Sequence, residues 1–291
     1  MDRPDSPTVV VLGSVNMDLV TTTARRPAPG ETVLGSEFAT VPGGKGANQA
    51  IAAARSGARV RFLGAIGDDA FGTELAATLS EAGVDTTLLR RVDGASGIAT
   101  IVVDDTGENN IIVVAGANGR VTELTNTELA AIADADILLC QLEIPIDTVL
   151  AAARHARTSG TVVALNPSPV APLPADLWAA VDLAIVNSLE SEQYSAELAQ
   201  VAHVVRTLGR NGAEYRGAET DELSVGGLTV DVVDTTGAGD TFTGALVATW
   251  NQGATTALTW ANTAGSLATT RLGASSSIPD SAQIAAALTT G

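Results

Sequence analysis

The chain has 291 residues, of which 45% are apolar and 17% are charged, and its formal net charge is −17. This length allows one large α/β domain or two ordinary ones, and the low charged fraction excludes global disorder. The acidic balance argues against a nucleic-acid partner, which would require clustered Lys and Arg. No apolar run approaches the roughly 18 residues that cross a bilayer. Residues 1–5 lack the basic start of a secretory signal and Cys140 is the single cysteine, so we expect a cytoplasmic protein.

Short apolar runs rich in β-branched side chains alternate with Ala-rich stretches of helical length along most of the chain. Such runs are typical of strands buried on both faces of a parallel sheet. In chain order, the predicted strands are 8–13, 60–66, 137–140, 162–165, 183–186 and 203–205, and the predicted helices are 47–56, 73–82, 125–133, 146–159 and 241–250. This alternation predicts a doubly wound α/β sheet.

Two segments, 19–41 and 95–116, have a different pattern. They contain the β-branched runs 21–23, 31–34, 99–103 and 110–114, separated by turn residues such as Pro29-Gly30 and 104–107, and no helical stretch. We predict hairpin strands that form a small β-rich insertion. The main domain then comprises residues 1–18, 42–94 and 117–291.

Polar residues follow the predicted strands at the points where they end. They include Asn16 and Asp18, Gln141 and Glu143, Asn166, Asn187, and Thr207 with Gly209. In open α/β sheets, ligands bind beyond the carboxyl ends of the strands. Each residue alone could simply end its strand at the surface. Together they favour a site for a polyhydroxylated substrate.

The strongest local motif is Asp234-Thr235-Thr236-Gly237-Ala238-Gly239-Asp240, which leads directly into a predicted helix. Small residues let the backbone approach a ligand, and a helix N-terminus offers unpaired N–H groups and the positive end of a dipole. The motif therefore suits an anion hole for a phosphoryl group, with Asp240 as a carboxylate that can accept a proton. The alternative is that Asp240 only caps the helix.

A second glycine-rich motif, Pro42-Gly43-Gly44-Lys45-Gly46-Ala47-Asn48, contains the only lysine of the chain. It is not a Walker P-loop, because Gly follows Lys45, and residues 13–18 do not match the dinucleotide-binding G-x-G-x-x-G. A backbone turn lying against a sugar, with Asn48 bonding its hydroxyls, is one interpretation. A bare turn before a helix is the other.

The order and spacing of these motifs resemble the ribokinase branch of the PfkB carbohydrate kinase family over nearly the whole chain. The matching segments are 13–18, 27–32, 43–50, 67–72, 116–118, 141–143, 164–167 and 234–242. The resemblance implies a three-layer α/β/α sandwich with a mainly parallel central sheet and a small β-sheet lid. It also implies ATP-dependent phosphorylation of D-ribose at O5, giving D-ribose 5-phosphate.

The resemblance further implies roles for single residues. Asp240 matches the catalytic base, and Thr236, Gly237, Ala238 and Gly239 match the anion hole. The implied sugar-binding positions are Asn16, Met17, Asp18, Gly43, Gly44, Lys45, Gly46, Asn48, Glu143 and Asp240. The implied nucleotide-binding positions are Asn187, Thr207, Leu208, Gly209, Arg210, Asn211, Gly212, Gly239 and Asn262. Glu190 is implied to hold Mg²⁺ through water, and the implied site of an activating K⁺ comprises Asp234, Thr236, Ala268, Arg271, Gly273 and Ser277. In relatives the lid closes over the sugar and pairs two subunits, so a homodimer is expected.

Two other functions stay open at this point. The first is another PfkB sugar or nucleoside kinase, such as a fructokinase or an adenosine-type kinase. The second is a non-catalytic sugar-binding protein on the same fold. Only nineteen residues separate Asn187 from Thr207, where relatives carry a longer helical stretch, and we expect residues 191–202 to form a single truncated helix.

Overall fold

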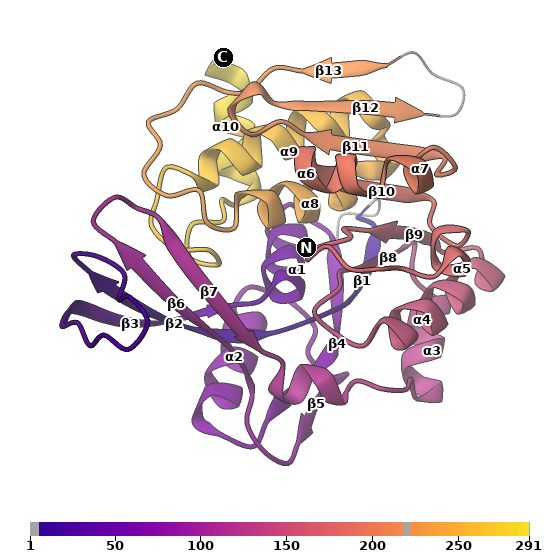
Figure 1. Cartoon of the computed structure of the whole chain (residues 1–291). Helices are drawn as coiled ribbons and strands as arrows, with labels where there is room; N and C mark the ends of the chain where they lie inside the picture. The colour runs from indigo at the N-terminus through magenta and orange to yellow at the C-terminus, as the bar shows by residue number, and fades with distance from the viewer. Residues whose placement is uncertain (1–5, 218–221, 291) are drawn as a thin grey trace.

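The computed structural model describes residues 6–217 and 222–290, and its centre is a nine-stranded sheet (Figure 1). The strand order is β13-β12-β11-β10-β9-β8-β1-β4-β5. Neighbours from β11 to β5 are parallel, whereas β12 and β13 are antiparallel at one edge. The strands are β1 Thr8–Leu12, β4 Arg59–Gly67, β5 Leu89–Val92, β8 Ile137–Cys140, β9 Val162–Leu165, β10 Leu183–Asn187, β11 His203–Thr207, β12 Ala213–Gly217 and β13 Leu223–Val225.

Helices cover both faces of this sheet because its strands are apolar on both sides. In β1, Val9 and Val11 join one buried cluster and Val10 and Leu12 join the other. The first cluster lies under α1 Lys45–Arg55, α2 Ala70–Glu81, α8 Ala238–Thr249, α9 Ala254–Ala268 and α10 Ser281–Thr290. The second lies under α3 Asn126–Ala133, α4 Ile146–Ser159, α5 Ala175–Trp178 and α7 Ser195–Leu198. The predicted three-layer α/β/α fold is confirmed (Figure 1).

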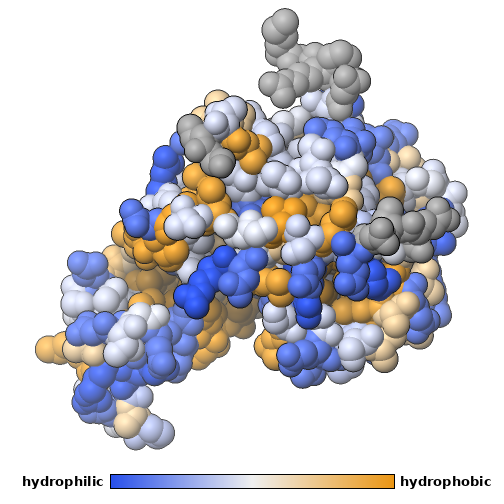
Figure 2. Space-filling model, turned by 90° about the horizontal axis from the view of Figure 1, so that it is seen from above, coloured by the Kyte–Doolittle hydropathy of each residue, from blue (hydrophilic) through white to orange (hydrophobic). Residues whose placement is uncertain are grey.

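A second sheet of four strands projects from the body as a separate lobe (Figures 1 and 2). Its order is β3-β2-β6-β7, with bounds β2 Asn16–Thr23, β3 Gly35–Gly43, β6 Gly97–Asp104 and β7 Asn109–Val114. The predicted strand at 31–34 is wrong. Pairing with β2 begins only at Gly35, opposite Thr23, and Leu34 is 92% exposed. The β-branched side chains of that run therefore have no partner strand.

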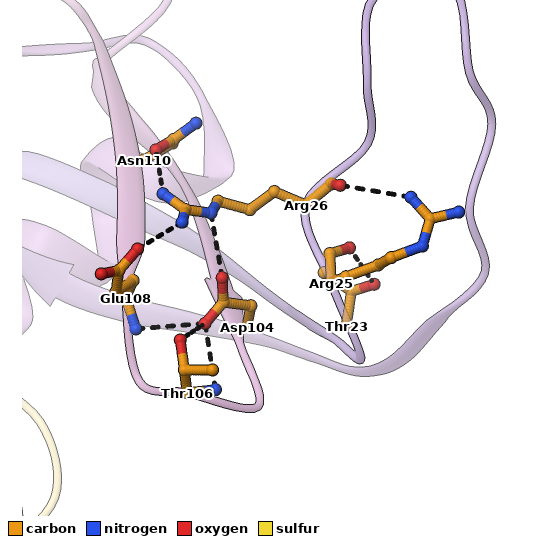
Figure 3. Close-up of polar contacts among 7 residues, drawn as sticks. All are labelled: Thr23, Arg25, Arg26, Asp104, Thr106, Glu108 and Asn110. Atoms are coloured by element: carbon orange, nitrogen blue, oxygen red, sulfur yellow. Dashed lines mark hydrogen bonds and ion pairs between the residues drawn. The ribbon is translucent and has the colours of Figure 1, made fainter.

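A polar cluster at the tip of the lobe fixes the turn between β6 and β7 (Figure 3). The Asp104 carboxylate accepts from the Thr106 amide at 3.0 Å and the Glu108 amide at 3.2 Å. The Arg26 guanidinium pairs with Asp104 at 2.9 Å and donates to Asn110 at 3.1 Å. The loop after β2 is thereby held against the β6–β7 hairpin.

The segment after β10 folds as two short helices, α6 Ser188–Gln193 and α7, so the expectation of a single truncated helix is wrong. They part at Tyr194, whose ring packs at 5.1 Å from that of Trp178 and whose hydroxyl bonds the backbone of Ala171. In the part of the chain that the structure describes, three 3-10 turns complete the elements: η1 Gly116–Arg120, η2 Gly209–Asn211 and η3 Trp250–Gln252. Within residues 6–217 and 222–290, no helix is long and apolar enough to cross a membrane. Residues 1–5, on which the expectation about a secretory signal depends, lie outside the described residues.

Candidate active site

Residues that follow neighbouring parallel strands meet at one edge of the large sheet, as the sequence predicts. Asn166 after β9, Asn187 at the end of β10 and Thr207 at the end of β11 line one cavity of about 160 Å³. Two residues from the glycine-rich motifs, Lys45 and Asp240, line the same cavity. The sheet edge and both motifs therefore form one site.

The turn before α1 lies directly on the backbone that follows β1. Gly44 has a φ of +93°, and a Cβ there would stand 2.8 Å from the Asn16 amide nitrogen. A Cβ on Gly46 would stand 2.6 Å from the Ser14 nitrogen. Glycine is required at both positions because no side chain fits between the two segments. The Lys45 amide donates to the Glu143 carboxylate at 3.1 Å, which fixes that acid beside the turn.

Asn16 and Asp18 begin the first strand of the lobe and share one of its faces, since they are two residues apart. Asn16 pairs with Gly43 of β3 and with Gly97 of β6, and its side-chain oxygen accepts from Asn118 at 2.7 Å. Asn16 and Asp18 thus lie at the junction between the two sheets.

Three carboxylates gather near this junction, from Asp18, Glu143 and Asp240. Burial, and then the negative charges of Glu143 and Asp240, raise the pKa of Asp18 to about 7. Carboxylates accept hydrogen bonds from hydroxyl groups, so this group of acids is suited to hold a polyol.

Asp240 does not cap helix α8. The N-cap is Gly237, whose φ of +74° is left-handed, and no side chain caps the first turn. Instead, the Asp240 carboxylate accepts from the Asn48 amide at 3.1 Å and from the Gln49 amide at 2.9 Å. The helix N-terminus is left with main-chain N–H groups that can bind an anion, and the Asp240 carboxylate lies beside them.

Lys45 is a partly buried cation among acids. Its burial lowers the pKa of the ammonium group, but the charges of Asp240, Glu143 and Glu190 more than compensate, and the net change is upward. Lys45 lines the same small cavity as Glu190 and Asp240, so it supplies positive charge where the two motifs meet.

A larger cavity of about 610 Å³ adjoins the first, and both are lined by Thr207 and Gly239. The sequence-predicted residues Thr207, Gly209, Arg210, Gly212, Gly239 and Asn262 line the larger cavity. Leu208 and Asn211 form the turn that carries Gly209 and Gly212, through bonds from Leu208 to Gly212 and from Asn211 to Leu208. Sequence reasoning missed Gly227, Leu228, Thr229, Val230, Val232, Phe242, Gly265, Ser266 and Thr269, which also line it.

Asn187 and Glu190 lie in the smaller cavity and cap α6 reciprocally. The Glu190 amide donates to the Asn187 side chain at 2.8 Å, and the Asn187 amide donates to Glu190 Oε2 at 2.9 Å. Glu190 is 4% exposed. The cap uses one of its carboxylate oxygens, so the second is available to a hydrated cation. Within the described residues, no group of three or more His, Cys, Asp or Glu could hold a metal ion.

The loop before α8 is tied to the loop after α9 through Asp234. Its carboxylate accepts from the Thr236 amide and from the Gly273 amide, each at 2.9 Å. A Cβ on Gly237 would stand 3.0 Å from Ala274. Burial raises the pKa of Asp234, but the bonds from Thr236 and Gly273 more than offset this, and the pKa is lowered. Two of the loops expected around a monovalent cation are therefore in contact.

Comparison with known proteins agrees with this arrangement. The profile of the pfkB family carbohydrate kinases matches residues 6–281, so the chain belongs to this family of phosphotransferases. Several of its relatives within the family are ribokinases. Ribokinase from Bacillus subtilis is 39% identical, with coverage of 93% of this chain and 96% of the relative. Ribokinase from Schizosaccharomyces pombe is 37% identical, with coverage of 93% and 94%. The solved structure of Arabidopsis thaliana ribokinase complexed with ribose and ATP has a TM-score of 0.90 at 31% identity, with coverage of 97% and 99%.

Proposed function

We propose that the protein is an ATP-dependent kinase that phosphorylates D-ribose at O5. The observation that carries the proposal is the position of Asp240. It lines the smaller cavity and bonds Asn48, and it directly follows Gly239, which lines both cavities. The larger cavity takes the nucleotide in this proposal, and the pocket around Asp18, Glu143 and Asn48 takes the pentose. The Arabidopsis relative solved with ribose and ATP supports this assignment.

In the proposed mechanism, Asp240 accepts the proton of the ribose hydroxyl while the hydroxyl oxygen bonds to the terminal phosphorus of ATP. The bond from that phosphorus to the bridging oxygen breaks, and ADP leaves. Asn48 and Gln49 hold the carboxylate in place through its two oxygens. The uncapped first turn of α8, with Gly237, Ala238 and Gly239, stabilises the charge on the transferring phosphoryl group. Lys45 adds a fixed positive charge on the same side. Phosphoryl transfer depends mainly on such positioning and charge stabilisation.

A divalent metal, Mg²⁺ in this proposal, enters with ATP. The oxygen ligands and buried position of Glu190 suit a hydrated Mg²⁺, which keeps several of its waters. The bound ion would neutralise phosphate charge, which matters in a chain with a net charge of −17. The contribution of this chain is to place Glu190 and Asn187 beside the cavity that Asp240 lines.

We further propose that K⁺ binds between the loops that Asp234 joins, with Thr236, Ala268, Arg271, Gly273 and Ser277 as the surrounding positions. Several of these would act through main-chain oxygens. Cation binding there would rigidify the N-terminal turn of α8, because Gly237 packs on Ala274.

The four-stranded lobe is proposed to close over the sugar and to pair two subunits. Its edge strand β7 is exposed along its whole length, including Ile111 at 53% and Ile112 at 67%, and Phe38 on β3 is 66% exposed. Such an apolar edge is suited to a second copy of the chain. The proposal also places the enzyme in the cytoplasm, where the single buried thiol of Cys140 stays reduced.

The substrate assignment is tested by a coupled assay of ADP release with D-ribose, D-fructose and adenosine as acceptors. The proposal predicts the highest kcat/KM for D-ribose and a product phosphorylated at O5. A preference for fructose or adenosine would make the protein another pfkB kinase. Ribose binding without ADP release would make it a sugar-binding protein.

A further inference from the structure

A chain of buried side-chain amides runs from the sheet edge to Asp240. Gln141 follows β8, Asn166 follows β9 and Gln49 belongs to α1. Gln49 and Gln141 are fully buried, and Asn166 is 9% exposed. Gln141 donates to Gln49 Oε1 at 2.6 Å, and Gln49 Nε2 donates both to Asn166 Oδ1 at 3.0 Å and to Asp240 Oδ1 at 2.9 Å.

These bonds fix which end of the Gln49 amide faces Asp240. A primary amide presents two donors at nitrogen and an acceptor at oxygen. Gln141 donates to the oxygen and Asn166 accepts from the nitrogen, so the nitrogen is also the end turned to Asp240. Asn166 is fixed in turn, because its own nitrogen donates to the Ile185 carbonyl at 2.9 Å. A flipped Gln49 would place its oxygen against the carboxylate and lose all three bonds.

The row of hydrogen-bonded amides leaves one buried polar atom unpaired. Gln141 Oε1, the acceptor atom of that side chain, has no hydrogen-bond partner among residues 6–217 and 222–290. A Cβ on Gly13 would stand 2.1 Å from that oxygen, so Gly13 is the residue that leaves room for it. A buried unsatisfied polar atom destabilises a folded protein, and an apolar side chain would fill the space without that cost. Filling the core is therefore an insufficient reason for glutamine at position 141.

We propose that Gln49 is a positioning residue for Asp240, and that Gln141 and Asn166 act by holding the Gln49 amide in its donating orientation. The inference rests on the proposed role of Asp240 as the base. Asn48 holds the other carboxylate oxygen, so loss of Gln49 would leave Asp240 free to rotate about that remaining bond.

The test measures kcat and KM for ribose against pH in Gln49→Leu, Gln49→Glu and Gln141→Leu. Gln49→Leu should lower kcat about tenfold to hundredfold, the usual effect of losing a hydrogen bond to a charged group, with KM for ribose changed less than about threefold. Gln141→Leu, which leaves Gln49 in place, should lower kcat in the same direction by a smaller factor. The exposed Gln200 provides the matched control, and Gln200→Leu should keep the parent kcat.

Gln49→Glu distinguishes positioning from packing. It would set a second carboxylate against Asp240, and two adjacent carboxylates retain a shared proton. The other charged groups acting on Asp240, Asp18 and Lys45, are unchanged in this variant. Its kcat should therefore rise by up to about tenfold per pH unit above neutrality, whereas Gln49→Leu should stay low at every pH.

Parallel assays of the parent and Asp240→Asn separate the possible failures. If the parent does not phosphorylate ribose, or Asp240→Asn keeps most of its activity, the proposed function or the base is wrong. If Asp240→Asn is inactive but Gln141→Leu keeps the parent kcat and Gln49→Glu keeps the parent pH profile, the positioning role is wrong. If Gln49→Leu does not fold, its melting temperature and ribose binding will reveal it. In that case Gln49→Glu and Gln141→Leu still test whether Gln49 positions Asp240.

Discussion

The side-chain amide of Asn48 donates to the Asp240 carboxylate at 3.1 Å, although the two residues are 192 positions apart in the chain. Asn48 lies in the first turn of α1 and Asp240 in the first turn of α8, and each helix follows a glycine-rich turn. The bond therefore brings the two motifs into one site. In the proposed function, the first turn holds the sugar and the second turn holds the phosphoryl group.

We predict that glycine is required at position 44 for two reasons. Its φ is left-handed, and the neighbouring backbone leaves no room for a side chain. Gly44→Ala combines the left-handed strain of a φ of +93° with a Cβ 2.8 Å from Asn16 N. We expect a loss of about 2–4 kcal/mol in the free energy of unfolding and a raised KM for ribose. Gly57→Ala is the control, because its φ is +103° but no atom lies within 4 Å of the added Cβ. Equal losses in the two variants, measured by urea unfolding, would exclude the close contact as the cause.

Asp18 is predicted to destabilise the unliganded protein at neutral and higher pH. Its pKa of about 7, against an ordinary 3.8, means that the folded state binds the proton more tightly. Its favourable contribution is present below pH 3.8 and is lost as the pH rises from about 4 to 7. Asp18→Asn should exceed the parent in stability by on the order of 2–4 kcal/mol at pH 8 and by little at pH 4.

Urea unfolding at both pH values measures this difference. Asp69 serves as the comparison, because its pKa is shifted in the opposite direction. Burial raises the pKa of Asp69, but bonds from Ser96 and Gly72 lower it overall. Asp69→Asn should therefore lose stability at pH 8. A parent that is as stable as Asp18→Asn at pH 8 would contradict the raised pKa. Asp18→Asn should also bind ribose more weakly, because it loses a carboxylate acceptor.

Exchange of K⁺ for Na⁺ is predicted to lower kcat. The loops that Asp234 joins carry the N-cap of α8, and an ion of the wrong size would leave this turn less ordered. Asp234→Asn should reduce the response to K⁺, because it would put an NH₂ donor where a carboxylate oxygen now accepts from the Thr236 or the Gly273 amide. Initial rates in matched KCl and NaCl at constant ionic strength provide the measurement. Equal rates in the two salts would remove the cation site from this account.

The apolar edge of the lobe is predicted to hold two subunits together. Ile112→Glu places a charge on β7, where the parent side chain is 67% exposed, and should shift the protein from dimer to monomer. Leu288→Glu on α10, a site 39% exposed and outside the lobe, should leave the dimer intact. Sedimentation velocity distinguishes these species. A parent that is monomeric at the concentrations of the assay would refute the pairing.

Buried parallel strands were the most predictable part of the fold. The strands 137–140 and 162–165 and the helix 146–159 have the predicted bounds, because burial on both faces imposes a continuous apolar run. The lobe was harder to predict. Its strands depend on partners, and the run ending at Leu34 has strand-forming residues but no strand beside it.

The residues of the candidate site also divide into those that a local sequence pattern marks and those that depend on distant partners. Glycine-rich turns and polar residues at strand ends are visible in a sequence, and they line the smaller cavity here. Gln49 was missed because a glutamine in an Ala-rich helix resembles a surface residue, and its partners Gln141, Asn166 and Asp240 are distant in the chain. The only local signal was its place directly after Asn48. Residues 227–230, which line the larger cavity, belong to no motif that could have marked them.

The central claim is that Asp240 takes the proton of the sugar hydroxyl. The most direct measurement is ADP release with D-ribose by the parent and by Asp240→Asn, with ribose affinity determined by calorimetry on the same samples. We expect kcat to fall by about 10²–10⁴-fold, with ribose affinity changed less than a few-fold. An Asp240→Asn enzyme that retains most of the parent rate would contradict it.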